Sequence, residues 1–323
     1  MDLAIITVSY NTRDLLADCL ASVFDDLEYS DLEAEVWVVD NASADGSAEM
    51  VRQQFPLARL LAYEQNIGFA AANNLALREI GFLVSLSPSG NIAGSADLPR
   101  HVLFLNPDTR VMDGALSAMV GFLDEVPRAG AAGAQLLHDD GSFQHSAFAF
   151  PGLAQVFFDF FPLHPRLTNS RLNGRYPRRL YERGMPFAVD HPLGAALMVR
   201  GETLAQVGGF DERFFMYCEE IDLCRRIRSA GWGIHCVPQA KIVHLVAQST
   251  QQVRDRMFTA LWRSRYLMFD KHNGPLFGWL VRRLVRLGLW AEARRAHAAL
   301  QRGAISSEEL EGWLQAFREV AEL

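Results

Sequence analysis

The sequence lacks the two glycine-rich loops that most often hold nucleotide phosphates. No GxGxxG follows the first expected strand, and no GxxxxGK[ST] occurs anywhere in the 323 residues. Their absence excludes the dinucleotide fingerprint and the P-loop, which both cradle phosphates with backbone N–H groups. A nucleotide bound here would need another means of holding its phosphates, such as a divalent cation on hard oxygen ligands.

Paired cysteines and long apolar runs are missing as well. The four cysteines, at positions 19, 218, 224 and 236, form no CxxC pair, which favours a reducing, cytosolic setting. The chain opens with LAIITVSY, which reads as a strand and not as a signal peptide, and no run of 18 apolar residues follows. We therefore expect a cytoplasmic protein.

Charge is unevenly distributed along a chain of net charge −7. Residues 1–50 hold twelve acidic side chains and one arginine, whereas residues 251–290 hold eight basic and two acidic ones. The basic region predicts contact with an anionic membrane surface or a phosphorylated acceptor, or else an ordinary solvated helix face. Half of the residues are hydrophobic, which is ample for a buried core.

Strand and helix patterns alternate in the first part of the chain. The expected strands are 3–9, 36–39, 59–63, 102–105 and 131–137, and the expected helices are 13–24, 45–55 with Asp45 as N-cap, 70–80 and 114–125. This alternation predicts a doubly wound, mostly parallel sheet of the Rossmann-like α/β class, in which ligands bind beyond the carboxyl ends of the strands. Tyr10, Asn11, Asp40 and Asp108 stand at such ends, so we expect them to face one crevice.

The pattern changes in the middle of the chain. Residues 148–161, FAFPGLAQVFFDFF, predict either a packed hairpin or a lid or membrane-facing segment, and residues 163–183, with six arginines and one glutamate, predict a long basic loop. Regular structure returns with strands at 194–199 and 234–237 and a helix at 219–228. The chain is helical and basic from about residue 251, so we expect a catalytic domain over 1–250 and a helical region over 251–323.

One carboxylate follows a strand directly. In HVLFLNPDTRV, the strand stops at Asn106-Pro107, and Pro107 places Asp108 rigidly beyond the strand end. Asp108 could bind a divalent cation on a diphosphate, or it could be part of an Asx-type turn. His244 follows a second strand-like stretch, AKIVHLV, and is either a structural histidine or a further ligand of the same cation.

Three carboxylates crowd the start of a helix in GGFDERFFMYCEEIDLCRRIRSAGW, residues 208–232. Glu219, Glu220 and Asp222 occupy three of four successive positions. Acidic residues stabilise helix N-termini, so capping is one interpretation. The other is a general base, because a neighbouring negative charge raises the pKa of a carboxylate.

Seven segments, taken in order, resemble inverting family-2 glycosyltransferases of the GT-A fold, in the bacterial rhamnosyltransferase-like branch of cell-wall and lipopolysaccharide assembly. They are IITVSYN (5–11), VVDNASADGS (38–47), NIGFAAANN (66–74), FLNPD (104–108), GAALMVR (194–200), GGFDERFFMYCEEIDLCRRIR (208–228) and HLVAQST (244–250). The resemblance implies metal-dependent, inverting transfer of a sugar, with rhamnose as the candidate, from a nucleotide-diphosphate donor. It implies a hydroxyl of a cell-surface glycan or a lipid-linked molecule as acceptor.

The resemblance also assigns roles to single residues. The donor would be bound by Thr7, Ser9, Tyr10, Asn11, Asp40, Asn66, Gly68, Asn74, Asn106, Gly194 and Ala195. Asp108 matches the last acid of the family's DxD-like motif, the ligand of Mg²⁺ or Mn²⁺, and His244 a histidine that can complete that site. Glu220 would be the catalytic base, with Glu219 as its rival because the family usually has Glu-Asp here. The motif's first acid is Asn106 in this chain, and the glycine usual in VAQST is replaced.

The implied partners are dTDP-rhamnose or a UDP-sugar, and no nucleic acid. A non-catalytic carbohydrate- or nucleotide-sugar-binding module of the same fold remains an alternative, because fold does not imply activity. Homo-oligomerisation and the role of the 85–100 loop stay open. In the C-terminal region, arginines interleave with leucine and tryptophan over 276–290, which predicts either a peripheral helix on the inner face of the cell membrane or a helix packed on the catalytic domain.

Overall fold

The computed structural model describes residues 1–83, 98–245 and 254–323, which form two compact units. The first unit takes Met1–Phe148, Tyr176–Phe215 and Glu219–Ser249, and the second takes Ala149–Arg175, Met216–Cys218 and Thr250–Leu323. The second unit therefore combines the helical region expected from about residue 251 with segments from the middle of the chain. Most of the 85–100 loop and the VAQST segment lie outside the described residues.

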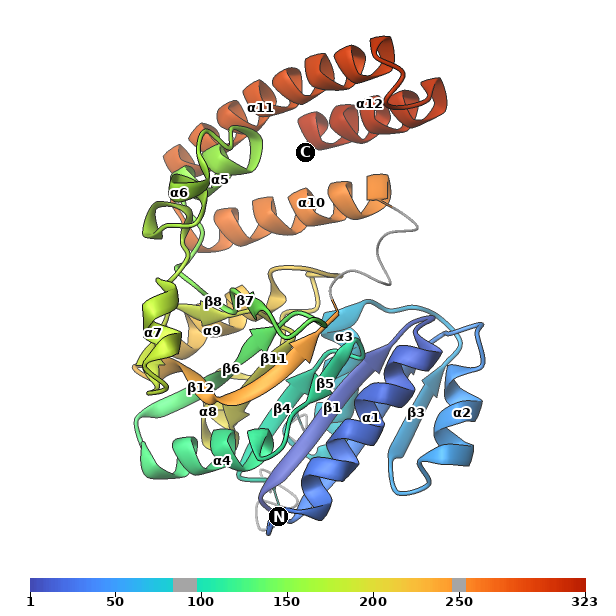
Figure 1. Ribbon diagram of the computed structural model, residues 1–323, viewed down its shortest axis with the longest axis vertical. Helices are drawn as coiled ribbons and strands as arrows, with labels where there is room; N and C mark the ends of the chain where they lie inside the picture. Colours follow the sequence, from blue (N-terminus) through green and yellow to red (C-terminus); the bar gives the residue numbers. More distant parts are fainter. Residues whose placement is uncertain (84–97, 246–253) are drawn as a thin grey trace, which may run out of the picture. The chain divides into compact units, whose positions relative to one another are not determined.

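The first unit is built on a central sheet (Figure 1). Its strands are β1 Leu3–Ser9, β2 Ala34–Asn41, β3 Arg59–Tyr63, β4 His101–Leu105, β5 Thr109–Val111, β6 Ala129–Leu137, β7 Phe143–Gln144, β9 Phe187–Ala188, β11 Ala196–Arg200 and β12 Gly233–His244. The main order is β3-β2-β1-β4-β11-β6-β12-β5, and β8 (Ala147–Phe148) and β10 (His191–Pro192) form a separate pair. Parallel pairing joins β3, β2, β1 and β4, and also β6 and β12, whereas β11 is antiparallel to both of its neighbours. The doubly wound, mostly parallel sheet is confirmed.

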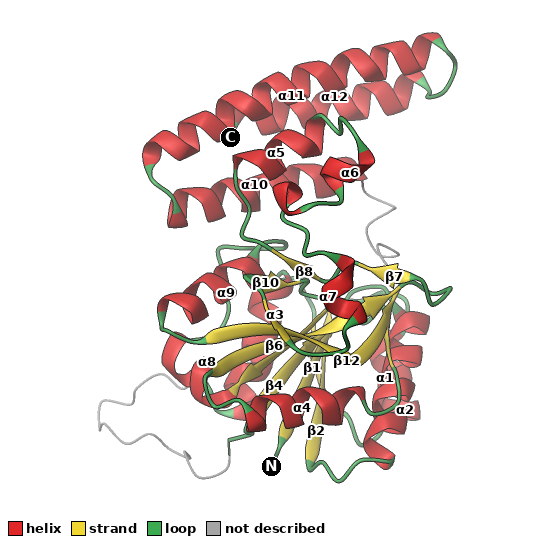
Figure 2. Ribbon diagram, turned by 60° about the vertical axis from the view of Figure 1, so that its left-hand side comes forward, coloured by secondary structure: helices red, strands yellow, loops and turns green. Residues whose placement is uncertain are grey.

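Helices cover both faces of this sheet (Figure 2). They are α1 Arg13–Glu28, α2 Ser47–Gln54, α3 Phe69–Ile80, α4 Ala115–Glu125, α7 Arg178–Glu182, α8 Gly201–Val207 and α9 Glu219–Ser229. Leu103 and Leu105 of β4 share one core with α1, α2 and α4. Phe104 points to the opposite face, where its ring lies 4.6 Å from that of Phe210, which in turn meets Phe69 of α3. Successive side chains of a strand point to opposite faces of the sheet, so neighbouring residues of β4 pack against helices on opposite sides.

One carboxylate fixes two helix starts beside the carboxyl edge of the sheet. Asp45 Oδ1 accepts the N–H of Ser47, the first residue of α2, at 3.0 Å. Its Oδ2 accepts the N–H of Arg13, the first residue of α1, at 2.9 Å. Burial opposes ionisation, but the hydrogen bond from the Ser47 hydroxyl, together with these two backbone hydrogen bonds, prevails and lowers the pKa of Asp45. The N-cap of α2 is Gly46, and not Asp45 as the sequence predicted, because the helix begins two residues later; Asp45 precedes the cap and accepts the first N–H of both helices.

The second unit is helical. It contains α5 Leu153–Phe160, α6 Pro165–Thr168, the 3₁₀ helix η1 Arg171–Asn173, α10 Arg254–His272, α11 Pro275–Gln301 and α12 Ser307–Glu322. Of the two interpretations of 148–161, the packed hairpin is wrong, because most of that segment is α5. The 163–183 segment contains short helices instead of one long loop. Among the described residues, none of the helices combines the length and hydropathy needed to span a bilayer.

Aromatic stacking joins the mid-chain helix α5 to the C-terminal helices. The ring of Phe160 lies 5.2 Å from that of Trp262, in a stacked arrangement. Gly288 of α11 faces the same ring so closely that a Cβ there would collide with it. Arg295 Nη2 donates to the carbonyl of Phe160 at 2.9 Å. These contacts bury an aromatic side chain that the sequence left without a partner.

Candidate active site

The predicted donor-site residues gather at the carboxyl edge of the sheet. Ser9 pairs with Asp40 in the parallel register of β1 and β2, so the chain leaves both strands at the same edge. Because β11 is antiparallel to β4, its first residue lies opposite the last residue of β4. The N–H of Asn106 donates to the carbonyl of Ala195 at 2.9 Å. The edge thus joins the turns after β1, β2 and β4 to the start of β11.

Asp40 offers a buried acceptor at this edge. Its side chain is 3% exposed, and its Oδ2 accepts the N–H of Ser43 at 3.2 Å. Its Oδ1 is buried and has no hydrogen-bond partner among the described residues. Asn11 closes the turn, since its N–H donates to Ser43 Oγ and its Oδ1 accepts the N–H of Ala44. An unpaired buried acceptor is costly, so a donor group on a ligand would stabilise Asp40.

The other residues of the 7–11 segment divide by exposure. Thr7 and Ser9 are fully buried, and the hydroxyl of Ser9 shares a 2.9 Å hydrogen bond with that of Thr12. Tyr10 is 47% exposed at the end of β1. Within this segment, the surface that a donor could contact therefore comes from Tyr10 and Asn11.

Asn41, which the sequence analysis did not single out, organises the turn before α3. Its Nδ2 donates to Asn66 Oδ1 at 2.9 Å, and its Oδ1 accepts the N–H of Ile67 at 2.9 Å. Gly68 follows with φ +86°, and a Cβ there would lie 2.5 Å from the carbonyl oxygen of Phe215. Only glycine fits this position, which holds Asn66 at the edge beside β2. The only feature of the sequence that pointed to a role for Asn41 was its position directly after Asp40.

Asn74 is committed to a neighbouring loop. Its Nδ2 donates to the carbonyl of Phe210 at 2.8 Å and to Glu212 Oε1 at 2.9 Å, and its Oδ1 accepts the N–H of Phe210 at 2.9 Å. The side chain is 3% exposed. Asn74 therefore fixes the loop between α8 and α9, and its side-chain amide is already hydrogen-bonded within the protein.

The two predicted metal ligands meet. His244 Nε2 lies 3.5 Å from Asp108 Oδ1, because β12 pairs with β5 directly after Asp108. His244 Nδ1 lies 3.3 Å from Gln144 Oε1, an oxygen that can only accept. In the tautomer that carries its proton on Nδ1, Nε2 presents its lone pair to Asp108. Gln144 comes from the two-residue strand β7 and gave no sequence signal.

A proton or a cation has to lie between two acceptors that face each other. Burial raises the pKa of Asp108, with the charge of His244 acting in the opposite direction, and burial lowers the pKa of His244, with Asp108 opposing that shift. Both groups are thus held toward their neutral forms, and a bound cation would restore the carboxylate. Among the described residues no third His, Cys, Asp or Glu joins them.

Gly194 links this edge to the acidic helix start. A Cβ on Gly194 would lie 3.2 Å from Cγ of Glu220, so the glycine gives room to that side chain. Ala195 follows and accepts the hydrogen bond from Asn106, two residues before Asp108. The predicted base and the predicted metal ligand are therefore connected through one short run of contacts.

The two adjacent glutamates at the start of α9 differ in exposure. Glu219 is 6% exposed, and its Oε2 has no hydrogen-bond partner among the described residues. Burial, and then the negative charge of Glu220, raise the pKa of Glu219 well above its usual range. Glu220 is partly exposed. The residues before them, Tyr217 and Cys218, both have left-handed backbones, with φ of 71° and 67°, a strain typical of functional sites.

Asp222, the third acid of the cluster, has a structural partner. It is fully buried, and its Oδ2 accepts from Arg226 Nε at 2.9 Å. Arg226 also donates to the carbonyls of Val207 and Gly209, each at 2.7 Å. The pair therefore holds the glycine turn after α8, and the choice of base lies between Glu219 and Glu220.

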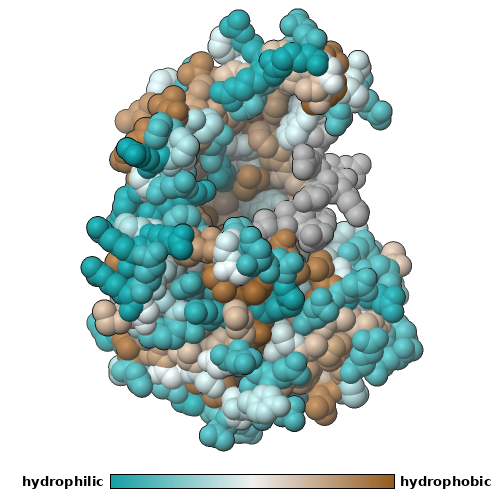
Figure 3. Space-filling view, in the orientation of Figure 1, coloured by the Kyte–Doolittle hydropathy of each residue, from teal (hydrophilic) through white to brown (hydrophobic). Residues whose placement is uncertain are grey.

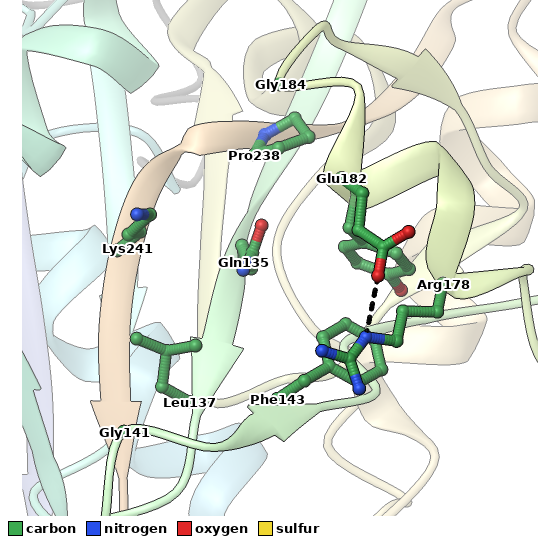
Figure 4. Close-up of a pocket in the computed structure, with 10 residues that line it drawn as sticks. Gln135, Leu137, Gly141, Phe143, Arg178, Glu182, Gly184, Pro238 and Lys241 are labelled. Atoms are coloured by element: carbon green, nitrogen blue, oxygen red, sulfur yellow. Dashed lines mark ion pairs between the residues drawn. The ribbon is translucent and has the colours of Figure 1, made fainter.

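A cavity of about 390 Å³ lies beside β7 (Figure 4). It is lined by Gln135, Leu137, Gly141, Phe143, Arg178, Tyr181, Glu182, Gly184, Pro238 and Lys241. Side chains of β6 and β12 stand on one side and those of α7 on the other, where Arg178 Nε pairs with Glu182 at 3.0 Å. None of the predicted site residues lines this cavity, although Phe143 directly precedes Gln144.

Comparison with known proteins places this site in a family. The model of glycosyl transferase family 2 matches residues 4–81. An N-acetylglucosaminyl-diphospho-decaprenol L-rhamnosyltransferase of Mycobacterium tuberculosis is 33% identical over 84% of this chain and 85% of that protein. The rhamnosyltransferase WbbL of Escherichia coli K12 is 29% identical over 49% of this chain and 57% of that protein.

A solved structure agrees on the fold. The mannosyltransferase PcManGT from Pyrobaculum calidifontis, in complex with GDP-Man and Mn²⁺, matches with a TM-score of 0.54 at 19% identity, covering 99% of this chain and 80% of that one. The GT-A fold is thereby confirmed. The chain belongs to glycosyltransferase family 2 and is a glycosyltransferase of its rhamnosyltransferase-like branch.

Proposed function

We propose that this enzyme is an inverting rhamnosyltransferase that uses dTDP-rhamnose, or failing that a UDP-sugar, and a lipid-linked glycan acceptor. The observation that carries the proposal is the run of contacts from Asp108 and His244 through Asn106, Ala195 and Gly194 to Glu220. The similarity to an enzyme named for N-acetylglucosaminyl-diphospho-decaprenol supports the acceptor class.

Asp108 and His244 would hold Mg²⁺ or Mn²⁺. The fit rests on their donor set, a carboxylate oxygen and an imidazole nitrogen 3.5 Å apart. Burial disfavours the carboxylate anion of Asp108, and a cation would stabilise that anion. Carboxylates suit both ions, and imidazole is tolerated as an additional ligand. When bound, such an ion offsets the negative charge that develops on a departing diphosphate. Mn²⁺ in the structural relative supports the same class of ion.

Glu220 is proposed as the general base. Inversion needs one carboxylate on the attacking side of the sugar, where it accepts the proton of the acceptor hydroxyl, and needs no enzyme nucleophile. Glu220 is partly exposed and therefore accessible to an acceptor, while burial and the charge of Glu220 raise the pKa of Glu219 and favour its protonated form. A protonated neighbour leaves the negative charge of the pair on Glu220, which is the form that a base requires.

The donor nucleotide is proposed to occupy the edge formed by the turns after β1 and β2. Asp40 Oδ1 would accept from an N–H of the base, because it has no partner among the described residues. Tyr10 and Asn11 are exposed next to it, and Asn66 lies across the turn held by Asn41. Gly68 shapes the backbone there without contributing a side chain.

A cytoplasmic location is proposed on the state of the cysteines. The four cysteines all lie in the described part of the chain, and each is buried and outside any disulfide bond, which suits a reducing compartment. A cytoplasmic enzyme reaches a lipid-linked acceptor at the inner face of the cell membrane.

Calorimetric titration of dTDP, UDP and GDP, each with and without Mn²⁺ or Mg²⁺, tests the proposed donor site. We expect metal-dependent binding of dTDP or UDP, and loss of the metal dependence in Asp108→Asn. Asp113→Asn, which changes an exposed aspartate just after β5, should bind like the parent. Equal, metal-independent binding by the parent and Asp108→Asn would overturn the metal assignment. Absence of binding to every diphosphate would favour the non-catalytic module.

A further inference from the structure

Helix α11 has two unlike faces. Its buried face consists of Gly278, Val281, Val285, Gly288 and Leu289. Its exposed apolar side chains are Leu276 (70% exposed), Trp279 (53%), Leu280 (37%), Leu287 (54%) and Trp290 (58%). The last four of these residues follow Leu276 at offsets of 3, 4, 11 and 14, so all five share one side of the helix. Exposed tryptophans at such a spacing exceed the scattered apolar residues of an ordinary surface.

Arginines stand on the same side. Arg283, Arg286 and Arg294 are exposed and follow Leu276 at offsets of 7, 10 and 18. The guanidinium of Arg283 lies 5.3 Å from the ring of Trp279, and that of Arg294 lies 4.8 Å from the ring of Trp290. The only acid in α11, Glu292, pairs with Arg295. We call the five apolar residues and these three arginines the α11 stripe.

The neighbouring helix α12 shows what an ordinary solvated face looks like in the same unit. Its apolar side chains Leu310, Phe317 and Val320 are buried. Its exposed positions include Glu308, Glu309, Glu311, Glu319 and Glu322. Packing within the unit therefore does not force large apolar side chains outward, and the stripe belongs to α11 alone. Figure 3 shows apolar and polar surface side by side over the C-terminal helices.

We infer that the α11 stripe docks on the surface of a bilayer that contains anionic lipids. Tryptophan and leucine side chains partition into the boundary between headgroups and acyl chains, and arginine pairs with lipid phosphates at that depth. The stripe carries three cations and no acid, so its charge complements an anionic leaflet. A helix that lies in this plane is anchored without spanning the bilayer.

A second copy of the chain fits the stripe less well. Two stripes facing each other would bring arginines together, which costs free energy. The acidic face of α12 offers charge but no exposed large apolar side chain to receive the tryptophans. The inference requires nothing of the donor, the metal or the base, so it stands or falls independently of the proposed function.

Vesicle co-sedimentation of the full-length protein tests the inference. The probes are vesicles of phosphatidylcholine alone and of phosphatidylcholine with phosphatidylglycerol, at low and at high salt. We expect partition onto the anionic vesicles, weakened by salt. Brominated phosphatidylcholine mixed into the anionic vesicles should quench part of the tryptophan fluorescence, because Trp279 and Trp290 enter the acyl boundary.

Two stripe variants and two matched controls identify the surface. The stripe variants are Trp279→Gln/Leu287→Gln/Trp290→Gln and Arg283→Gln/Arg286→Gln/Arg294→Gln. The controls change exposed residues elsewhere and are Tyr29→Gln/Leu57→Gln and Arg52→Gln/Arg128→Gln/Arg302→Gln. We expect each stripe variant to partition at least roughly tenfold more weakly, and the controls to behave like the parent. Thermal unfolding by circular dichroism verifies that all variants fold.

Three results would overturn the inference. The first is absence of partition onto anionic vesicles at low salt. The second is equal partition by stripe and control variants. The third is a dimer in solution that the apolar stripe variant dissociates while the parent shows no vesicle binding, because the stripe would then cover a second copy.

Discussion

Two adjacent glutamates show that burial, and not residue type, decides what a carboxylate can do. Glu219 and Glu220 have the same side chain and the same helix position to within one residue. Glu219 is buried, its Oε2 has no hydrogen-bond partner among the described residues, and burial raises its pKa. Glu220 lies next to Gly194 and remains partly exposed. Two carboxylates whose environments differ in this way commonly divide the neutral and ionised roles between them.

Replacing Glu220 by glutamine should abolish most transfer while leaving donor binding intact. The amide keeps the size of the side chain but cannot accept the proton of the acceptor hydroxyl. General-base assistance is worth roughly 10²–10⁴-fold, so we expect kcat to fall by at least roughly 10²-fold. Turnover assays paired with calorimetry of the bound nucleoside diphosphate would measure both. Near-normal turnover in Glu220→Gln, with a large loss in Glu219→Gln, would assign the base to Glu219.

Replacing Glu219 by glutamine should stabilise the fold, and more so as pH rises. Because burial and the charge of Glu220 raise the folded-state pKa of Glu219, the folded state keeps a proton that the unfolded state loses above pH about 4.5. Stability therefore falls as pH rises toward the folded pKa, and glutamine removes this loss. Urea unfolding at pH 4.5 and pH 7.5 should show a gain in the free energy of unfolding mainly at pH 7.5. The same gain at both pH values, or in the exposed control Glu311→Gln, would contradict this account.

The start of α3 depends on a backbone position that only glycine can occupy. Gly68 combines a φ of +86° with a ψ of 169°, and the carbonyl oxygen of Phe215 approaches it while accepting the N–H of Phe69 at 2.7 Å. This contact ties the turn near Asn66 to the loop that leads into α9. A small residue thus couples the proposed nucleotide side of the edge to the acidic helix start.

Alanine at position 68 should cost more stability than alanine at position 46. Gly46 has nearly the same φ, +84°, but a Cβ there would meet nothing within 4 Å, so Gly46→Ala carries only the left-handed backbone cost of about 1–2 kcal/mol. Gly68→Ala adds a Cβ at 2.5 Å from Phe215 O and a glycine-only conformation. We expect it to lower the free energy of unfolding by at least about 1 kcal/mol more than Gly46→Ala in urea titrations. Equal losses would mean that the Phe215 loop moves away freely.

The sequence predicted elements best where a period or a breaker residue marked them. The strand expected at 102–105 ends at Leu105, as β4 does, two residues before Pro107, which cannot donate to a strand ladder. The direction of β11 could not be predicted, because an antiparallel strand buried on both faces reads the same as a parallel one. Helix α5 was missed because an aromatic run such as VFFDFF fits a strand and a helix equally well, and only its packing in the second unit decides.

The candidate site was predictable wherever a polar residue follows a strand. Asp40, Asp108 and His244 stand at strand ends, and the structure brings Asp108 and His244 together. Residues inside an element were harder to judge. Thr7 faces the core of the sheet, and Asn74 is hydrogen-bonded to a loop that comes 136 residues later, a contact that no local pattern reveals.

The division of the molecule depends on contacts between distant parts of the chain. The sequence indicated one boundary near residue 250 from a change of composition. In the second unit, Phe160 stacks on Trp262 and faces Gly288, and Arg295 caps its carbonyl, so α5 and the C-terminal helices share one apolar core. A boundary drawn along the chain would therefore separate residues that bury each other.

Truncation after residue 250 should consequently yield a poorly soluble chain. Val156 and Phe160, 1% and 2% exposed in the full protein, would lose the helices that cover them and present a new apolar patch. We expect the fragment 1–250 to aggregate in size-exclusion chromatography under conditions in which the full chain does not. The same fragment carrying Val156→Gln/Phe160→Gln should recover solubility, because the patch itself is removed. A fragment that stays soluble without these substitutions would show that α5 finds other cover, and that the boundary near residue 250 suffices for folding.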